Sequence, residues 1–218
     1  LSLPLPMVNI INGGKHSNSG LSVQEFKLVP SGIVSYPEQL RAGSEIFHTL
    51  EKLLAKENFA TSVGDEGGFA PRVESHKRQL EILHQAITEA GYTPGKDIFL
   101  DLDVAADSFY DHEKEQYHLK PENVFLTRES MINLYREWIE SYHIVSLEDG
   151  LYEEDWEGWV IMKEKLARVD ASWGKKLLLI GDDLLVTNIT RLEKSIEMGA
   201  CNTILIKPNQ IGSLSETI

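Results

Sequence analysis

The second half of the chain alternates between short apolar runs and segments with helical spacing, and this alternation limits the possible folds more than any other feature. The apolar runs are IFLDLDV, IVSLED, LLLIGDD and TILIK, which begin at residues 98, 144, 177 and 203. Strands that alternate with helices in this way form a parallel sheet. Because no low-complexity linker divides the chain, we predict one α/β domain over residues 1–218.

The first half differs because two strands come before any helix. MVNIING and VQEFKLV flank the glycine-rich segment GGKHSNSG, which predicts an opening hairpin. A helix then begins at Ser35, with Glu38 at the capping-box spacing, and a second helix ends near Gly91. Their predicted apolar stripes are Leu40, Phe47, Leu50 and Leu54 in the first helix, and Leu80, Leu83 and Ile87 in the second. We count six strands in all, about two fewer than a closed barrel of this type contains.

Composition excludes several classes of protein. The chain has 21 Lys and Arg against 34 Asp and Glu, a net charge of −13, which disfavours a surface for nucleic acid or anionic membrane. Cys201 is the single cysteine, so no internal disulfide can form and a reducing compartment is expected. We find no apolar run of membrane-spanning length and no signal peptide, and we interpret the sequon at Asn188 as a helix cap. The chain begins without methionine and stops within a helical pattern, so we expect a piece of a longer protein.

Charged residues stand at the carboxyl ends of the four predicted parallel strands. They are Asp103, Glu148 with Asp149, Asp182 with Asp183, and Lys207. Parallel α/β barrels assemble their sites at this face. Each acid alone is more often a loop residue or a helix cap. Together they predict a bound cation, because like charges about 4 Å apart cost about 4 kcal/mol per pair at an effective dielectric of 20. Ligands that are all oxygen indicate a hard cation, and few protein ligands with open positions favour Mg²⁺ over Ca²⁺.

Lys207 follows TILI, which resembles a strand buried on both faces, and precedes Pro208. A lone lysine at such a position usually extends its ammonium to water. A nearby divalent cation and desolvation would instead lower its pKa and make it a base near neutral pH. A base and a divalent cation suit removal of a proton next to a carboxylate. Glu66, in the glycine-flanked SVGDEGGFAP, is a candidate acid that could share a proton with Glu25, although it also fits an ordinary turn residue.

Several motifs carry a family resemblance. NIINGGKHSNSG, QEF, VGDEGGFAP, LDVAA, SLEDG, IGDDLLVTN and ILIKPNQIGSLSET occur in the order and spacing of the enolase family, and the chain resembles that family over nearly its whole length. The resemblance implies an enolase-type TIM barrel, ββαα(βα)6, which lacks its last two strands here. It also implies a magnesium-dependent lyase of glycolysis that reversibly dehydrates 2-phosphoglycerate to phosphoenolpyruvate.

The same resemblance implies a role for each candidate residue. The Mg²⁺ ligands would be Asp103, Glu148 and Asp182. Lys207 would take the proton from carbon 2, and Glu66 would protonate the leaving hydroxyl with help from Glu25. The residues against the substrate would be His16, Gln24, Glu25, Glu148, Asp182 and Lys207. Asp183 would orient Lys207.

The chain also departs from the family pattern. Asp101 stands where a small residue is usual, Asp107-Ser108 where Ser-Glu is usual, and Gly150 where proline is usual. An acid that faces the site at Asp101 would shift metal affinity or be neutralised by a neighbour. The family's N-terminal capping domain and last two barrel strands, with a Ser-His-Arg-Ser-Gly motif and a second lysine, are not found in residues 1–218. We therefore expect a partial catalytic barrel domain that is inactive alone.

Two alternatives stay open from the sequence. Another member of the superfamily would act on a different carboxylate, but the Lys-x-Lys motif of those relatives is not found in residues 24–30. A noncatalytic binding protein is the alternative of another class, because enolases also occur at cell surfaces as adhesins. The resemblance implies a homodimer or homo-octamer in full-length form and a cytoplasmic location, with cell-surface or secreted forms left open. Nucleic acid is not an expected partner.

Overall fold

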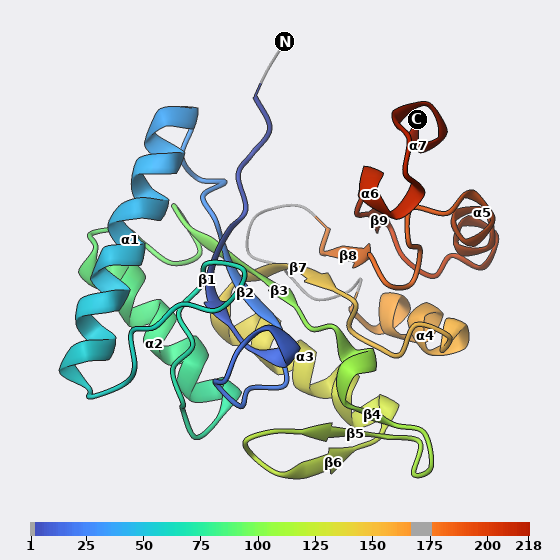
Figure 1. Ribbon diagram of the computed structural model, residues 1–218, viewed down its shortest axis with the longest axis horizontal. Coiled ribbons are helices and arrows are strands. Elements are labelled where there is room, and N and C mark those ends of the chain that lie inside the picture. The colour runs from blue at the N-terminus through green and yellow to red at the C-terminus, as the bar shows by residue number, and fades with distance from the viewer. Residues whose placement is uncertain (1–2, 167–175) are drawn as a thin grey trace.

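A six-stranded sheet forms the centre of the computed structural model, which describes residues 3–166 and 176–218 (Figure 1). In sheet order, the strands are β1 (Val8–Asn12), β2 (Glu25–Val29), β3 (Phe99–Asp103), β7 (Ile144–Glu148), β8 (Leu178–Gly181) and β9 (Thr203–Ile204). β1, β2 and β3 pair antiparallel, whereas β3, β7, β8 and β9 pair parallel. The predicted opening hairpin and parallel sheet are therefore confirmed. Among the described residues the barrel does not close, and β1 and β9 form its two edges.

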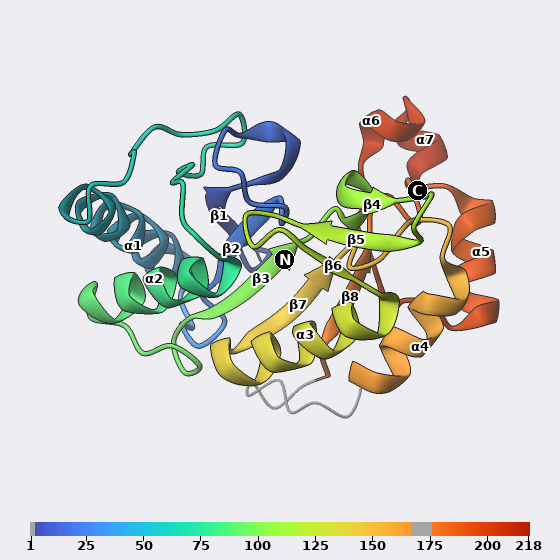
Figure 2. The ribbon, with the colours of Figure 1, turned by 90° about the horizontal axis from the view of Figure 1, so that it is seen from below.

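Five longer helices follow one another around the outside of the sheet (Figure 2). They are α1 (Tyr36–Lys56), α2 (His76–Glu89), α3 (Arg128–Tyr142), α4 (Trp156–Leu166) and α5 (Ile189–Met198). Short helices α6 (Pro208–Ile211) and α7 (Leu214–Thr217) come after β9. The predicted caps are confirmed: the Ser35 hydroxyl accepts the N–H of Glu38, and the Asn188 side chain accepts the N–H groups of Thr190 and Arg191.

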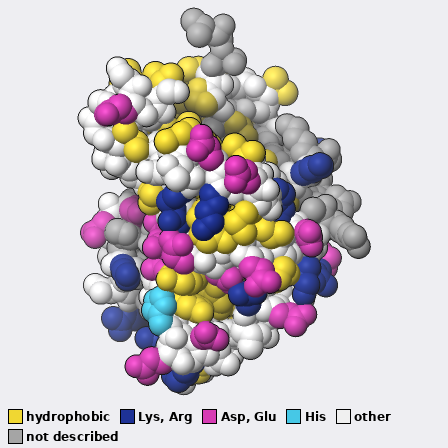
Figure 3. Space-filling model, turned by 90° about the vertical axis from the view of Figure 1, so that its right-hand side faces the viewer, with side chains coloured by type: hydrophobic (Ala, Val, Ile, Leu, Met, Phe, Trp, Pro, Cys, Tyr) yellow, Lys and Arg dark blue, Asp and Glu magenta, His cyan; other side chains and the backbone are white. Residues whose placement is uncertain are grey.

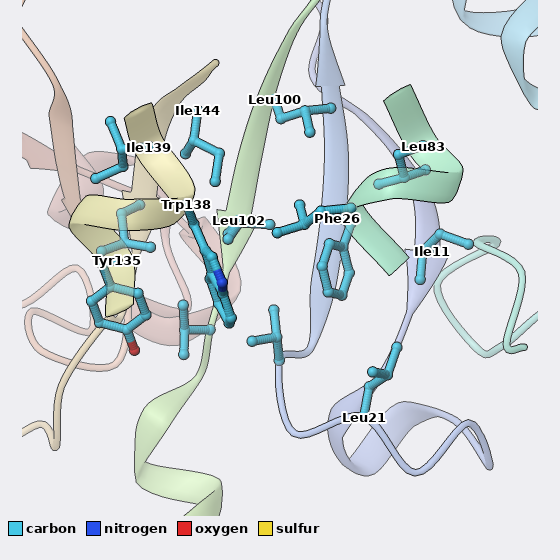
Figure 4. Close-up of a cluster of buried hydrophobic side chains, with 14 of the residues drawn as sticks. Ile11, Leu21, Phe26, Leu83, Leu100, Leu102, Tyr135, Trp138, Ile139 and Ile144 are labelled. Carbon is cyan, nitrogen blue, oxygen red and sulfur yellow. The ribbon is translucent and has the colours of Figure 1, made fainter. Parts of the chain in front are cut away.

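The main hydrophobic core lies between the sheet and these helices (Figure 4). Phe26 of β2 and Leu102 of β3 pack there with Trp138 of α3. Phe99 belongs instead to a small cluster with Val29 and Val145 on the other face of the sheet. Successive residues of β3 thus point to opposite faces, as the IFLDLDV pattern predicts. All five residues of β3 are buried, including its two aspartates.

A second, three-stranded sheet lies outside the barrel and was not predicted. Its strands are β4 (Tyr110–Asp111), β5 (Gln116–Leu119) and β6 (Val124–Leu126), and all of them pair antiparallel. Two short 3₁₀ helices, Gly14–His16 and Ala106–Phe109, lie in the loops after β1 and β3. The Ser22 N–H donates to the Lys120 carbonyl, and the Lys120 N–H donates to the Ser22 hydroxyl. These bonds fix the small sheet to the segment that precedes β2.

Two predictions of burial are wrong. Leu40 is 46% exposed, because the buried stripe of α1 passes through Gln39, Gly43 and Ile46 instead. The TILI segment is not buried on both faces: β9 spans only two half-buried residues, and Ile206 is 56% exposed because no described strand pairs with β9 on its outer side.

The side of the molecule next to β9 and α5 carries hydrophobic surface between charged side chains (Figure 3). A groove of about 610 Å³ runs here, and it is lined by Ile189, Leu192, Ile204, Ile206, Ile211 and Ile218 among others. Within the described ranges, no helix combines the length and apolar character needed to cross a membrane.

Candidate metal centre and active site

Buried carboxyl groups gather where β3, β7 and β8 end. β3 and β7 run parallel and place Asp103 beside Glu148 in register. Carboxylate oxygens of Asp103, Glu148 and Asp149 lie within 4.8 Å of one another, and those of Asp149, Asp182 and Asp183 form a second group with the same spacing. All of these side chains are buried except that of Asp183, which is half-buried. The three acids predicted as metal ligands thus lie in two groups that share Asp149.

Asp149 joins the loops after β7 and β8. Its backbone adopts φ +44°, in the left-handed region that aspartate enters more readily than most residues. Its carboxylate oxygens accept the N–H groups of Asp182 and Asp183 at 3.1 and 2.8 Å. Burial raises the pKa of Asp149 to about 8, although these N–H donors act in the opposite direction. The sequence indicated Asp149 as an acid at a strand end but not as the residue that holds the β8 loop.

Lys27 lies among the same carboxyl groups and was not predicted. Its Nζ is 2.8 Å from Glu148 Oε2, 2.9 Å from Glu25 Oε2 and 3.3 Å from Asp101 Oδ2. Burial lowers the pKa of Lys27, but the surrounding carboxylates, Asp101 first, raise it well above its ordinary value. Lys27 is therefore the neighbour that balances Asp101. The alternation in VQEFKLV could have revealed it, because Glu25 and Lys27 share one face of β2.

The carboxyl groups of this cluster are costly to ionise. Burial raises the pKa of Asp103, and the charge of Glu148 raises it further. Burial likewise raises the pKa of Glu148, although Lys27 opposes that shift. The pKa of Asp101 is raised by burial against the attraction of Lys27. Buried oxygen ligands that repel one another are the donor set that a hard divalent cation satisfies, so these residues fit a cation of that kind.

The candidate acid lies at the β1 edge of the sheet. Asn12 Nδ2 donates to Glu66 Oε2 at 2.8 Å, and Asn12 Oδ1 accepts the Gly68 N–H at 2.8 Å. Asn9 Nδ2 donates to Glu25 Oε1 at 3.0 Å. Two asparagines of β1 thus bring Glu25 and Glu66 to the same part of the site. This role of Asn9 and Asn12 was not predicted, because residues three apart lie on opposite faces of a regular strand, and the pairing register of β1 shifts between Asn9 and Ile11.

The remaining predicted residues are Gln24, His16 and Asp183. Gln24 Nε2 donates to Asp103 Oδ2 at 3.2 Å. His16 is the last residue of the 3₁₀ helix in the loop after β1. Asp183 follows β8, and burial raises its pKa, with Asp182 the next cause. Of the departures from the family pattern, Gly150 is buried, and a Cβ added there would lie 2.9 Å from Leu147 Cδ2.

Lys207 lies at the opposite edge of the sheet, three residues after β9 ends at Ile204. Its ammonium pairs with Oδ2 of Asp182. The other oxygen of this carboxylate, Oδ1, accepts a hydrogen bond from Gln210 Nε2 at 2.9 Å. The side chain of Lys207 is 43% exposed. Burial lowers its pKa, but the hydrogen bond and charge of Asp182 outweigh burial and raise it above the ordinary value. The lowering of the Lys207 pKa that we expected from the sequence is therefore absent when no cation is bound nearby, because Asp182 stabilises the ammonium.

The chain is similar to proteins of one known family over its whole length. The family model described as "Enolase, C-terminal TIM barrel domain" matches residues 1–218. The chain is 50% identical to the enolases of Helicobacter pylori strains J99 and G27, and 49% identical to that of Helicobacter acinonychis strain Sheeba. Each comparison covers all 218 residues of the chain and 49% of the relative. The chain thus spans about half the length of the curated relatives it matches.

Proposed function

The chain belongs to the enolase family, and on that premise we propose that it forms part of a magnesium-dependent lyase of glycolysis, which reversibly dehydrates 2-phosphoglycerate to phosphoenolpyruvate. The observation that carries the proposal is the gathering of buried acidic strand ends beside Lys207, with Glu25 and Glu66 bound to asparagines of the other edge strand, β1. Residues 1–218 supply the partial catalytic barrel domain. Activity is expected of the longest protein that the gene encodes rather than of these residues alone.

The proposed ligands of Mg²⁺ are Asp103, Glu148 and Asp182. Their support is an all-oxygen, buried donor set whose members lie in two groups of carboxylates bridged by Asp149. When bound, the ion supplies positive charge near the substrate carboxylate, whose negative charge grows as the neighbouring carbon loses its proton.

Lys207 is the proposed base and Glu66 the proposed acid. In this assignment, Lys207 accepts the proton from carbon 2, and Glu66 donates a proton to the leaving hydroxyl with help from Glu25. Because Asp182 stabilises the ammonium, we expect Lys207 to become a base only when Asp182 engages another ligand. Support for two separate sides comes from the sheet order, since Lys207 follows one edge strand and Asn12 of the other edge strand binds Glu66.

Substrate contacts are proposed for six residues of the site. They are His16, Gln24, Glu25, Glu148, Asp182 and Lys207. Asp183 is proposed as a supporting residue that helps to orient Lys207, and the charge of Lys207 does lower the pKa of Asp183 against the larger effect of burial. A homo-oligomer and a cytoplasmic location, with surface or secreted forms in addition, complete the proposal.

The test is magnesium-dependent conversion of 2-phosphoglycerate by the longest protein that the gene encodes. Lys207→Ala should lower kcat by about 10²–10⁴-fold, the usual contribution of a positioned base. Lys114→Ala is the matched control, because Lys114 pairs with Asp111 on the exposed turn between β4 and β5. Conversion that needs no Mg²⁺, or a Lys207→Ala variant as active as the control, would contradict the proposal.

A second variant separates the acid from the base. Glu66→Gln should still exchange the carbon 2 hydrogen with solvent, because Lys207 is intact, but should lose dehydration. If Glu66→Gln loses exchange and dehydration to the same extent, Glu66 does not have the role of acid assigned to it here.

A further inference from the structure

The contacts of Lys27 assign it a role in the site that the proposed reaction does not require. Its side chain is 13% exposed, and its ammonium contacts carboxylates from three strands: Glu25 on β2, Asp101 on β3 and Glu148 at the end of β7. Three negative charges around one ammonium leave a net charge of about −2 if all are ionised, before Asp103 is counted. Lys27 therefore does not satisfy the cluster, and a divalent cation is still needed there.

Asp101 depends on Lys27 more than the other two carboxylates do. Its side chain is completely buried, and among the described residues Lys27 is its cationic partner, while the neutral Ser146 hydroxyl is a weaker influence that also lowers its pKa. Lys27 and Asp101 face each other directly in the antiparallel register of β2 and β3. A buried charge without its partner is strongly destabilising, whereas loss of both members of a pair is often tolerated.

The two other carboxylates gain a fixed position from Lys27. The ammonium holds one oxygen of Glu148, a proposed metal ligand, and one oxygen of Glu25, the proposed helper of the acid. Since Lys27 and Asp101 carry opposite charges, the two together add no net charge to the site.

We propose that Lys27 and Asp101 form a charge-neutral positioning pair that holds Glu25 and Glu148 in place for the cation and the substrate. This inference rests on the proposed function for the meaning of the site, but its contacts do not depend on it. In the pair, Asp101 limits how strongly Lys27 competes with a cation for Glu148. Lys27 in turn compensates an acid that would otherwise be isolated in the interior.

The pair predicts an unusual pattern of variant effects. Asp101→Ala leaves Lys27 with only Glu25 and Glu148 as ion-pair partners and removes a negative charge, so Mg²⁺ affinity should fall roughly tenfold, the equivalent of about 1.4 kcal/mol. Adding Lys27→Met to Asp101→Ala removes the competitor and restores the net charge, so most of that affinity should return. Lys27→Met alone leaves the buried Asp101 without a cationic partner and should lower the unfolding temperature more than the double substitution does.

The experiment is a double-mutant cycle in the longest protein that the gene encodes. Mg²⁺ alone is titrated by calorimetry, and thermal unfolding is followed in the presence of a chelator. A matched cycle on the exposed pair Lys165 and Glu129, 2.9 Å apart, should show little coupling. Recovery of Mg²⁺ affinity by the second substitution is a result that a purely structural pair would not give.

Two outcomes would overturn the inference. One is additive losses of Mg²⁺ affinity in the double variant, and the other is an unfolding temperature that Lys27→Met leaves unchanged. Because neither readout uses 2-phosphoglycerate, both stay informative if that substrate is not converted. Failure of the pair is thus distinguished from failure of the proposed reaction.

Discussion

Stability should depend jointly on Mg²⁺ and pH, because the acidic cluster is costly to ionise without a cation. The carboxylate oxygens of each group lie within 4.8 Å of one another, and two charges at that upper limit repel by about 3.5 kcal/mol at an effective dielectric of 20. Asp103, Glu148 and Asp149 contain three such pairs. The folded protein without a cation is therefore expected to keep protons on this cluster that the unfolded chain releases.

The direction of the pH dependence follows from the raised pKa values. Asp103, Glu148 and Asp149 bind protons more tightly in the folded state than in the unfolded chain, with Asp149 reaching a pKa of about 8. Their stabilisation is thus present at low pH and is lost as the pH rises from about 4 toward 8. In a chelator, the contribution of these groups to the free energy of unfolding should fall across this window.

Addition of Mg²⁺ should reverse that loss. A ligand at 100 times its dissociation constant stabilises the folded state by about 2.7 kcal/mol. For a chain of this size, about 1 kcal/mol corresponds to roughly 2–4 °C in the unfolding temperature. We therefore expect Mg²⁺ to raise the midpoint by about 5–10 °C at pH 8, and by less at pH 5.5, where protons compete for the ligands.

The assay is a series of thermal melts at both pH values, in a chelator and in excess Mg²⁺. The control is Asp103→Asn, which removes one charge from the repelling group. It should be more stable than the parent in chelator at pH 8 and should gain less from Mg²⁺. An equal Mg²⁺ effect at the two pH values, or an Asp103→Asn variant less stable than the parent in chelator at pH 8, would refute the reasoning.

Two further predictions concern the loop that carries Glu66 and the open sheet edge. Asn12→Ala leaves the buried Gly68 N–H unsatisfied, so it should cost about 1–3 kcal/mol of stability and lower turnover; unchanged melts and kinetics would show that these bonds contribute nothing. Residues 1–218 expressed alone should self-associate, because β9 is an open edge beside the exposed Ile206. Sedimentation of a monodisperse monomer, with strong amide protection at residues 203–206, would contradict this prediction.

The hydrophobic periodicity of the sequence was sufficient to predict the six-stranded sheet and the acidic residues at the ends of its strands. Apolar residues in β3, β7 and β8 mark strands buried on both faces, and parallel strands bring their carboxyl ends to one side. Asp103 and Glu148 meet there for that reason. The same reasoning fails at β9, because a strand at a sheet edge has the same apolar sequence as one in the interior.

Contacts across the sheet were harder to predict than the strands themselves. Lys27 was missed because the prediction considered charged residues at strand ends, and Lys27 lies in the middle of β2. Its two-residue spacing from Glu25, which places both on one face of the strand, was visible in the sequence. The role of Asp149 depends on a positive φ and on N–H groups from the β8 loop, and a single sequence reveals neither. The direction of the Lys207 pKa shift required knowledge that Asp182, 25 positions earlier, contacts its ammonium.

The order of the strands in the sheet has a consequence for synthesis on the ribosome. Each strand of the six-stranded sheet pairs with the strand of that sheet made before it, from β1 to β9. A chain that emerges at about 5–20 residues per second can therefore add strands at one growing edge without waiting for a distant segment. The antiparallel hairpin of β1 and β2 is the first pair to emerge, and β3 completes the Lys27 and Asp101 contact before β7 brings Glu148. This order of synthesis allows Lys27 to neutralise the buried Asp101 before the remaining parallel strands are made.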